Sequence, residues 1–119
     1  MLVDRVFTKD HQDPYKGIRF VERDSKITNA DGSLVAEIKN VSVPDTWSQV
    51  AVDIMAQKYF RKAGVPARLK KKFEPGVPEW LCPSVPDEER LNQLPESAQF
   101  ARETTSQQVF HRLAGCWTY

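Results

Sequence analysis

Seven lysine and arginine side chains lie within residues 58–72, and no acidic residue lies among them. Outside this basic block acids outnumber bases, so the nearly neutral total of 17 basic and 16 acidic residues conceals a local charge of +7. Such a cluster can attract phosphate groups or nucleic acid. The alternative, which we favour, is a solvated helix end and loop that pairs with acidic neighbours. The candidate phosphate or docking contacts are Arg61, Lys62, Arg68, Lys70, Lys71 and Lys72, and Lys58 completes the block.

Residues that usually carry catalysis or bind metals are few and far apart in this chain. Cys82 and Cys116 lack the C-x-x-C spacing of a zinc site, and we expect both to be unpaired small hydrophobic residues. The two histidines, His11 and His111, are 100 positions apart. The chain also has no phosphate-binding loop, dinucleotide-binding or nucleophile-elbow motif. Taken alone, the residues therefore predict no catalytic, cofactor-binding or metal-binding site.

The elements that position these side chains must fit into 119 residues, which is room for one domain. The composition, with 40% hydrophobic and 28% charged residues, is typical of a globular protein. No run of about 18 apolar residues could cross a membrane. The first residues lack the apolar core of a signal peptide. We therefore expect a cytoplasmic protein without a membrane partner.

Residues 18–43 have the pattern of a small antiparallel sheet of two or three strands. Apolar and polar residues alternate over 18–22 and 34–38, as in half-buried strands. Asp31-Gly32 between them supplies the positive φ that a hairpin turn requires. Residues 1–16 are interpreted as an irregular N-terminal segment. Because a two-stranded ribbon is not stable alone, this hairpin needs a further element to pack on.

A long helix is predicted from Trp47 to about Ala63, with Thr46 and Gln49 as a capping box and Gly64 at its C-terminal end. Its apolar residues form two stripes on nearly opposite sides of the helix. The first stripe contains Trp47, Val50, Ala51, Ile54 and Met55, and the second contains Val52, Ala56, Tyr59, Phe60 and Ala63. Because a single core needs only one stripe, we expect the second to be covered by something outside this small unit.

Residues 65–100 are rich in proline, and we expect a weakly structured strap with a short basic turn at 68–73. A second helix is predicted to open at 103–106, with Val109, Phe110 and Leu113 on one face and Gly115 at its end. The apolar Trp-Thr-Tyr ending is interpreted as a cut through a longer chain. The predicted fold class is α+β, with a small antiparallel β-hairpin sheet, a long helix, an extended Pro-rich strap and a C-terminal helix.

Two long runs, PDTWSQVA at 44–51 and AQKYFRKAGVP at 56–66, carry a family resemblance. Shorter runs extend it: NADGS at 29–33, ARLKK at 67–71, GVPEWL at 76–81, SVP at 84–86 and QVFHRLAGCWTY at 108–119. Together they resemble the N-terminal region of class II, adenosylcobalamin-dependent (vitamin B12-dependent) ribonucleotide reductases. The resemblance covers nearly the whole chain from about Phe7. It implies that residues 17–119 are the N-terminal domain of such an enzyme.

In that family this region precedes a ten-stranded α/β barrel, which converts ribonucleotides to deoxyribonucleotides by thiyl-radical chemistry. The resemblance therefore implies a fragment that is inactive alone and an accessory domain to the barrel. The family's catalytic cysteines have no match up to Tyr119, so no catalytic role passes to Cys82 or Cys116. Adenosylcobalamin and the ribonucleotide would be bound by the full enzyme, and the barrel would be the partner of this chain, in cis or in trans.

The resemblance also implies what covers the unpaired surfaces. The second apolar stripe would pack on the barrel, and the strap would lie along the barrel surface. The basic block would stabilise the docked domain or face nucleotide phosphates, and we expect docking. Two alternatives stay open. One is a small nucleic-acid-binding module that uses residues 58–72, although few aromatic residues lie among the basic ones. The other is a split subunit that works in trans with a separate barrel chain.

Overall fold

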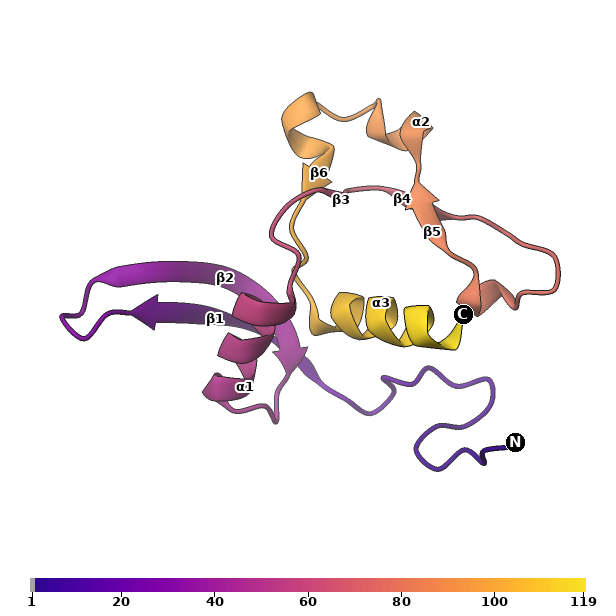
Figure 1. The fold of residues 1–119 in the computed structure, drawn as a ribbon, viewed down its shortest axis with the longest axis horizontal. Helices are drawn as coiled ribbons and strands as arrows, with labels where there is room; N and C mark the ends of the chain where they lie inside the picture. Colours follow the sequence, from indigo (N-terminus) through magenta and orange to yellow (C-terminus); the bar gives the residue numbers. More distant parts are fainter. Residues whose placement is uncertain (1) are drawn as a thin grey trace.

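The computed structural model describes residues 2–119, and its helices and strands begin at Phe20. The longer elements are β1 (Phe20–Thr28), β2 (Leu34–Pro44), α1 (Gln49–Ile54), a π-helical segment (Met55–Tyr59) that continues α1, and α3 (Ser106–Thr118). Between them lie β3 (Val65–Pro66), β4 (Leu69–Lys71), β5 (Ser84–Pro86), α2 (Glu88–Leu91) and β6 (Phe100–Ala101). Figure 1 shows the hairpin at one end, α1 and α3 in the middle and the strap as an excursion on the other side. The predicted α+β class is confirmed.

The hairpin is formed by β1 and β2 alone, which pair antiparallel from Phe20 opposite Pro44 to Thr28 opposite Leu34. Gly32 adopts the expected positive φ of +85°. The turn is closed by a hydrogen bond from the Asn29 amide to the Ser33 carbonyl, at 2.8 Å. The end of the hairpin near Pro44 is buried, whereas the exposed turn end projects away from the rest of the fold (Figure 1). The predicted hairpin is therefore confirmed, with two strands.

One hydrophobic core joins the hairpin to both main helices. Its buried members are Val41, Val43, Val52, Met55, Ala56, Phe60 and Val109, with Ile38, Trp47 and Leu113 packed against them. Burying one valine, methionine or phenylalanine side chain contributes roughly 1.5–3 kcal/mol, so this cluster holds the fold together. It supplies the packing partner that the ribbon requires.

The first helix is shorter than predicted at both ends. Its N-cap is Ser48, whose Oγ accepts from the Ala51 amide at 3.2 Å, so the expected Thr46–Gln49 capping box is wrong. The Gln49 side chain instead donates to the Asp24 carbonyl. The helical run ends at Tyr59 rather than Ala63. Phe60 is extended, and the backbone of Arg61 is hydrogen-bonded to Glu103, as described below.

Each of the two apolar stripes contributes part of the core, so neither has the role expected for it from the sequence. Val52, Ala56 and Phe60 of the second stripe are buried in the core against β2 and α3, so they are not free to pack on a barrel. In the first stripe Met55 is buried, but Val50 and Ile54 are exposed. The exposed side of α1 is therefore the side that we expected, from the sequence, to be buried.

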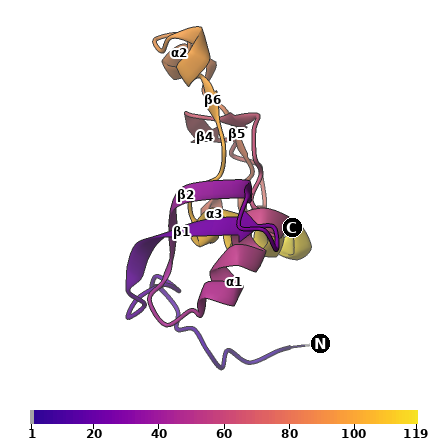
Figure 2. The ribbon, with the colours of Figure 1, turned by 90° about the vertical axis from the view of Figure 1, so that its left-hand side faces the viewer.

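The strap is more ordered than predicted and folds back on itself. β3 pairs antiparallel with β6, and β4 pairs antiparallel with β5. The expected basic turn at 68–73 is largely strand, because Lys70 and Lys71 pair with Val85 and Ser84. Figure 2 shows that this excursion projects away from the hairpin and α1.

The C-terminal helix begins where predicted but does not end at Gly115. Thr105 is the N-cap of α3 in a complete capping box, with its Oγ1 accepting from the Gln108 amide and Gln108 Oε1 accepting from the Thr105 amide. Gly115 lies inside the helix, and its carbonyl accepts from the Tyr119 amide at 3.0 Å. A glycine inside a helix lowers stability by roughly 1 kcal/mol relative to alanine. α3 nevertheless continues through Gly115, because its other hydrogen bonds outweigh this cost.

The described residues form an extended body. The radius of gyration is 17.2 Å, against about 13.5 Å for a compact domain of this length. The accessible surface is 9332 Å², roughly 2,700 Å² more than expected for a folded monomer of this mass. Part of this surplus belongs to the exposed residues 2–14, and the rest to the projecting hairpin, strap and helices.

Candidate functional site

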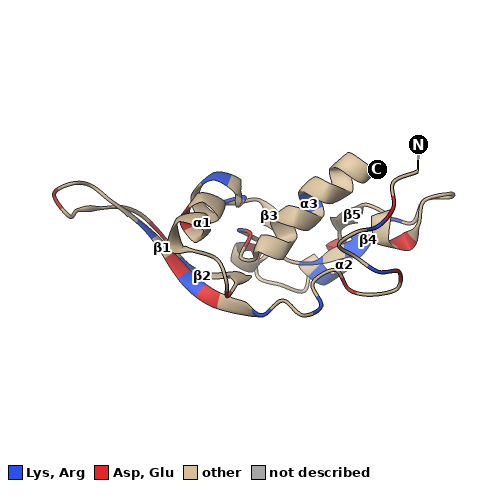
Figure 3. Ribbon diagram, turned by 90° about the horizontal axis from the view of Figure 1, so that it is seen from below, with Lys and Arg blue, Asp and Glu red and all other residues tan. Residues whose placement is uncertain are grey.

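The basic block does not gather into one cluster. Lys58 lies in the π-helical segment, Lys62 follows it, and Lys70 and Lys71 belong to β4 in the strap. Figure 3 shows the blue segments at the end of α1 and on β4 as separate places in the fold. No member of the block forms an ion pair with an acidic side chain in the part of the chain that the structure describes. The expected pairing with acidic neighbours is therefore not found.

Some of the candidate contacts are already engaged within the fold. Lys71 is half-buried and its Nζ donates to the Cys82 carbonyl at 2.8 Å. Arg68 donates to the neighbouring Ala67 carbonyl at 2.9 Å. Side chains alternate along a strand, so Lys70 and Lys72 lie on the opposite face from Lys71, and both are exposed. These two lysines are the best placed of the block to meet a partner.

Lys62 lies at the rim of an open hollow beside the β3–β6 pair. The hollow is lined by Lys62, Ala63, Gly64, Phe100, Ala101 and Arg102. Arg102 is held there by its hydrogen bond to the Lys39 carbonyl, at 2.6 Å. The site is shallow and lies open to solvent, so it does not enclose a ligand.

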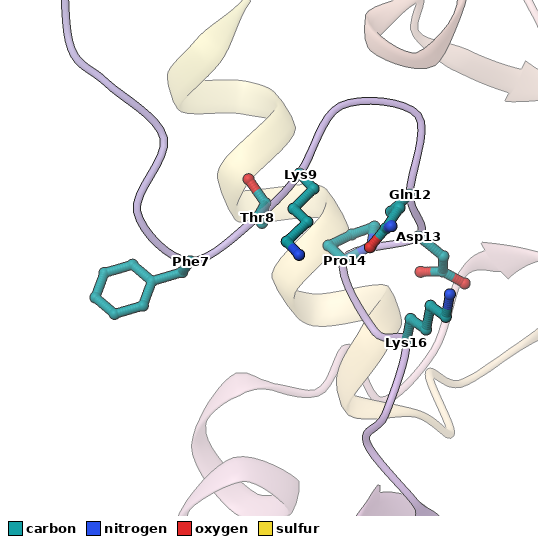
Figure 4. Close-up of a pocket in the computed structure, with 7 residues that line it drawn as sticks. All are labelled: Phe7, Thr8, Lys9, Gln12, Asp13, Pro14 and Lys16. Carbon is teal, nitrogen blue, oxygen red and sulfur yellow. The ribbon is translucent and has the colours of Figure 1, made fainter.

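A second hollow lies within the N-terminal segment (Figure 4). Its walls come from residues 7–16 only, and its volume is about 140 Å³, below the roughly 300 Å³ at which ligand pockets begin. Figure 4 shows the Phe7 ring pointing away from the other lining side chains. One of these two hollows is too small and the other too open to enclose a corrin ring. The residues that line them do not fit cobalamin, so no step that involves it is assigned to them.

The two cysteines belong to different elements of the fold. Cys82 is buried in the strap and Cys116 is exposed on α3, and both are free thiols. Within residues 2–119 no group of three or more His, Cys, Asp or Glu side chains is placed to hold a metal ion. No helix in this same range has the length and apolarity that a membrane span requires.

The strongest polar constellation, which the sequence did not predict, is centred on Glu103. This carboxylate is only 4% exposed. It accepts from the Arg61 amide at 2.8 Å and from Arg112 Nη2 at 3.0 Å. The Glu103 amide donates to the Arg61 carbonyl, and Arg112 also donates to the Tyr59 carbonyl. These bonds tie the end of the π-helical segment to the start of α3, so their role is structural.

A second polar contact joins the strap to the end of α3. The Tyr119 hydroxyl donates to a Glu74 carboxylate oxygen. This hydrogen bond, together with the negative charge of Glu74, raises the pKa of Tyr119 above its ordinary value. The contact fixes the strap relative to α3 but has no catalytic geometry.

Comparison with known proteins supplies the identity that the geometry alone does not. Residues 21–119 match the family described as class II vitamin B12-dependent ribonucleotide reductase. All 119 residues are 56% identical to the vitamin B12-dependent ribonucleotide reductase of Bradyrhizobium diazoefficiens and 50% identical to that of Agrobacterium fabrum. Over 68 residues, or 56% of the chain, the identity to the Streptomyces avermitilis enzyme of the same name is 41%.

The chain spans only 10%, 9% and 7% of the length of these three curated relatives. None of these matches supports the alternative of a nucleic-acid-binding module. The family match covers most of the chain and includes the two runs at 44–51 and 56–66. The chain therefore belongs to the class II vitamin B12-dependent ribonucleotide reductases and corresponds to the N-terminal part of these enzymes.

Proposed function

We propose that residues 17–119 are the N-terminal accessory domain of an adenosylcobalamin-dependent ribonucleotide reductase, preceded by the irregular segment 1–16. The full enzyme would reduce ribonucleotides in the cytoplasm, by thiyl-radical chemistry in a ten-stranded α/β barrel. The observation that carries this proposal is identity of 50% or more over the whole chain to reductases that are about ten times longer.

The domain would support the catalytic barrel and not perform the chemistry. This division is supported by the polar groups of the described residues, since the buried carboxylate of Glu103 is engaged in structural bonds and neither hollow encloses a ligand. Adenosylcobalamin and the ribonucleotide would accordingly be held by the rest of the enzyme.

The basic block would contribute to docking on the barrel. Lys70 and Lys72 are exposed and form no ion pair within residues 2–119, so their charges are available to an acidic partner surface. Rim charges of this kind mainly accelerate and orient association, and add little to the affinity. Of the remaining candidates, the side chains of Arg68 and Lys71 donate to backbone carbonyls. Lys62 lies at the open hollow, and Arg61 is bonded only through its backbone.

An activity measurement tests the proposal. The full-length reductase that contains these residues should form deoxyribonucleotide only when adenosylcobalamin is supplied, and the isolated 119-residue chain should form none. Activity of the isolated chain, or a full-length enzyme that is indifferent to adenosylcobalamin, would overturn it. Mixing the isolated chain with a barrel chain that lacks this region tests the arrangement in trans, where a gain of activity identifies a split subunit.

A further inference from the structure

The two main helices carry apolar stripes that nothing in residues 2–119 covers. On α1 these residues are Val50, which is 67% exposed, and Ile54, which is 50% exposed. On α3 they are Phe110, Ala114 and Trp117, which follow one another at spacings of four and three residues and therefore share a face. Trp117 is 81% exposed. Large apolar side chains exposed along one side of a helix are candidates for an interaction surface.

The two stripes start from one point of the fold. The Trp47 ring, just before α1, packs edge-to-face on the Phe110 ring, with the ring centres 6.1 Å apart. From this contact one stripe runs along α1 through Val50 to Ile54, and the other runs along α3 to Trp117. We call these residues together the helix face: Trp47, Val50, Ile54, Phe110, Ala114 and Trp117.

Charge is nearly absent from the helix face. α3 contains no Lys, Asp or Glu, and its single arginine, Arg112, is occupied by Glu103. Figure 3 accordingly shows α3 tan except at one place. On α1 the only charged residue is Asp53, which accepts from the Gln49 side chain at 3.0 Å. Aromatic enrichment with depletion of charge is the composition of the buried centre of a protein interface and not of its rim.

We propose that the helix face is the surface by which this segment docks on the catalytic part of its own reductase, an inference that rests on the proposed function. The curated relatives continue for about nine tenths of their length beyond what this chain covers, which provides the occupant. The partner surface must be apolar and poor in charge.

This assignment places the centre of the docking surface on the helices and not on the strap or the basic block. Trp47 and Trp117 have a residue type that is enriched among the residues that dominate binding energy in interfaces. Phe110 belongs to the aromatic residues enriched in interfaces, and the Trp47 and Phe110 rings already contact each other. The lysines of the strap would then lie at the rim, where charge adds little affinity.

Hydroxyl-radical footprinting of the full-length reductase tests the docking surface without any substitution. Two matched pairs serve as probes, Val50 with Val35 and Ile54 with Ile27. The hairpin members, Val35 and Ile27, are 57% and 40% exposed, so each pair has the same side chain at similar exposure. In the isolated chain, oxidation rates within each pair should be similar. In the full-length enzyme Val50 and Ile54 should react about five-fold more slowly, as expected for residues at an interface centre, while Val35 and Ile27 should not change.

Equal rates for Val50 and Val35 in the full-length enzyme would overturn the assignment. Protection of Val50 in the isolated chain that grows with concentration would also overturn it, because the occupant would then be a second copy. Adenosylcobalamin-dependent activity is measured on the same sample. An active enzyme in which Val50 and Ile54 are not protected refutes only the docking surface. An inactive enzyme in which they are protected refutes only the proposed function.

A pair of double variants supplies a second readout. Val50→Asp with Ile54→Asp should leave the isolated chain folded, because both side chains are exposed there. The same changes should make this segment far more sensitive to proteolysis in the full-length enzyme. The control, Val35→Asp with Ile27→Asp, should have no such effect. Equal sensitivity of the two double variants would contradict the docking surface.

Discussion

Replacing Glu103 by alanine is expected to destabilise the chain more than any other single loss of charge. Glu103 and Arg112 form an ion pair at 3.0 Å, with side-chain exposures of 5% and 28%. Removing one partner of a buried pair costs about 3–5 kcal/mol, and the partial exposure of Arg112 favours the lower figure. The change also leaves the Arg61 amide without its acceptor. A loss of about 3 kcal/mol is a large share of the 5–15 kcal/mol that stabilises a typical domain.

Urea unfolding followed by tryptophan fluorescence measures this loss. With a slope of about 2 kcal/mol per molar urea, the midpoint of Glu103→Ala should fall by about 1.5 M. Glu103→Gln keeps an acceptor for the Arg61 amide, so its unfolding midpoint should lie between those of Glu103→Ala and the unsubstituted chain. The control is Glu37→Ala, which removes contacts with the exposed lysines 26 and 39 and should cost at most about 1 kcal/mol. A Glu103→Ala midpoint no lower than that of Glu37→Ala would refute the structural role of Glu103.

Three further predictions concern local features of the fold. Ser48→Ala should lower the free energy of unfolding in urea by about 1 kcal/mol, because the α1 cap is lost. Thr46→Ala should be nearly neutral. A larger loss for Thr46→Ala than for Ser48→Ala would identify Thr46 as the cap. Gly64 has φ +75° with open space around its Cα, so Gly64→Ala should cost about 1 kcal/mol from backbone strain alone, and an unchanged midpoint would contradict this conformation. Hydrogen bonds from Ser33 lower the pKa of Asp31. The stabilisation of the hairpin turn by these bonds is therefore fully present above the unfolded-state pKa of Asp31 and is lost as the pH falls through its folded-state pKa. A carboxyl NMR titration that gives an unshifted pKa for Asp31 would contradict this.

Local signals in the sequence were sufficient to predict the elements whose ends are determined by neighbouring residues. The Asp31-Gly32 turn and the alternation beside it predicted the hairpin, and Gly32 has the positive φ that the turn needs. The start of α3 followed from hydroxyl residues at 104–106, of which Thr105 is the cap. These features depend on contacts within a few residues, so they can be read without knowledge of the fold.

Features set by distant residues could not be predicted in this way. The first helix stops early because Glu103, 42 positions away, bonds the Arg61 backbone, and no local pattern announces that contact. Periodicity identified two apolar stripes on the first helix but could not show which of them packs on β2. In the structure Val52 and Ala56 of the second stripe are part of the core. Glu103 itself lies in a loop before α3, where an acidic residue is usually solvated.

For the candidate site the sequence located charge but not its arrangement. The basic block was visible as a run of lysines and arginines, yet its members are distributed over the π-helical segment, β4 and the loops beside them. The helix face was hidden because its two stripes come from segments far apart in the sequence, which the Trp47–Phe110 contact brings together.

Amide hydrogen–deuterium exchange, compared between the isolated chain and the full-length reductase, tests most directly whether this segment is an accessory domain fixed on the catalytic part. Amides of α1 and α3 should exchange more slowly in the full-length enzyme than in the isolated chain, whereas amides at the hairpin turn should exchange at the same rate in both. Identical exchange of α1 and α3 in the two proteins would contradict it, because the segment would then fold and move independently of the enzyme to which it belongs.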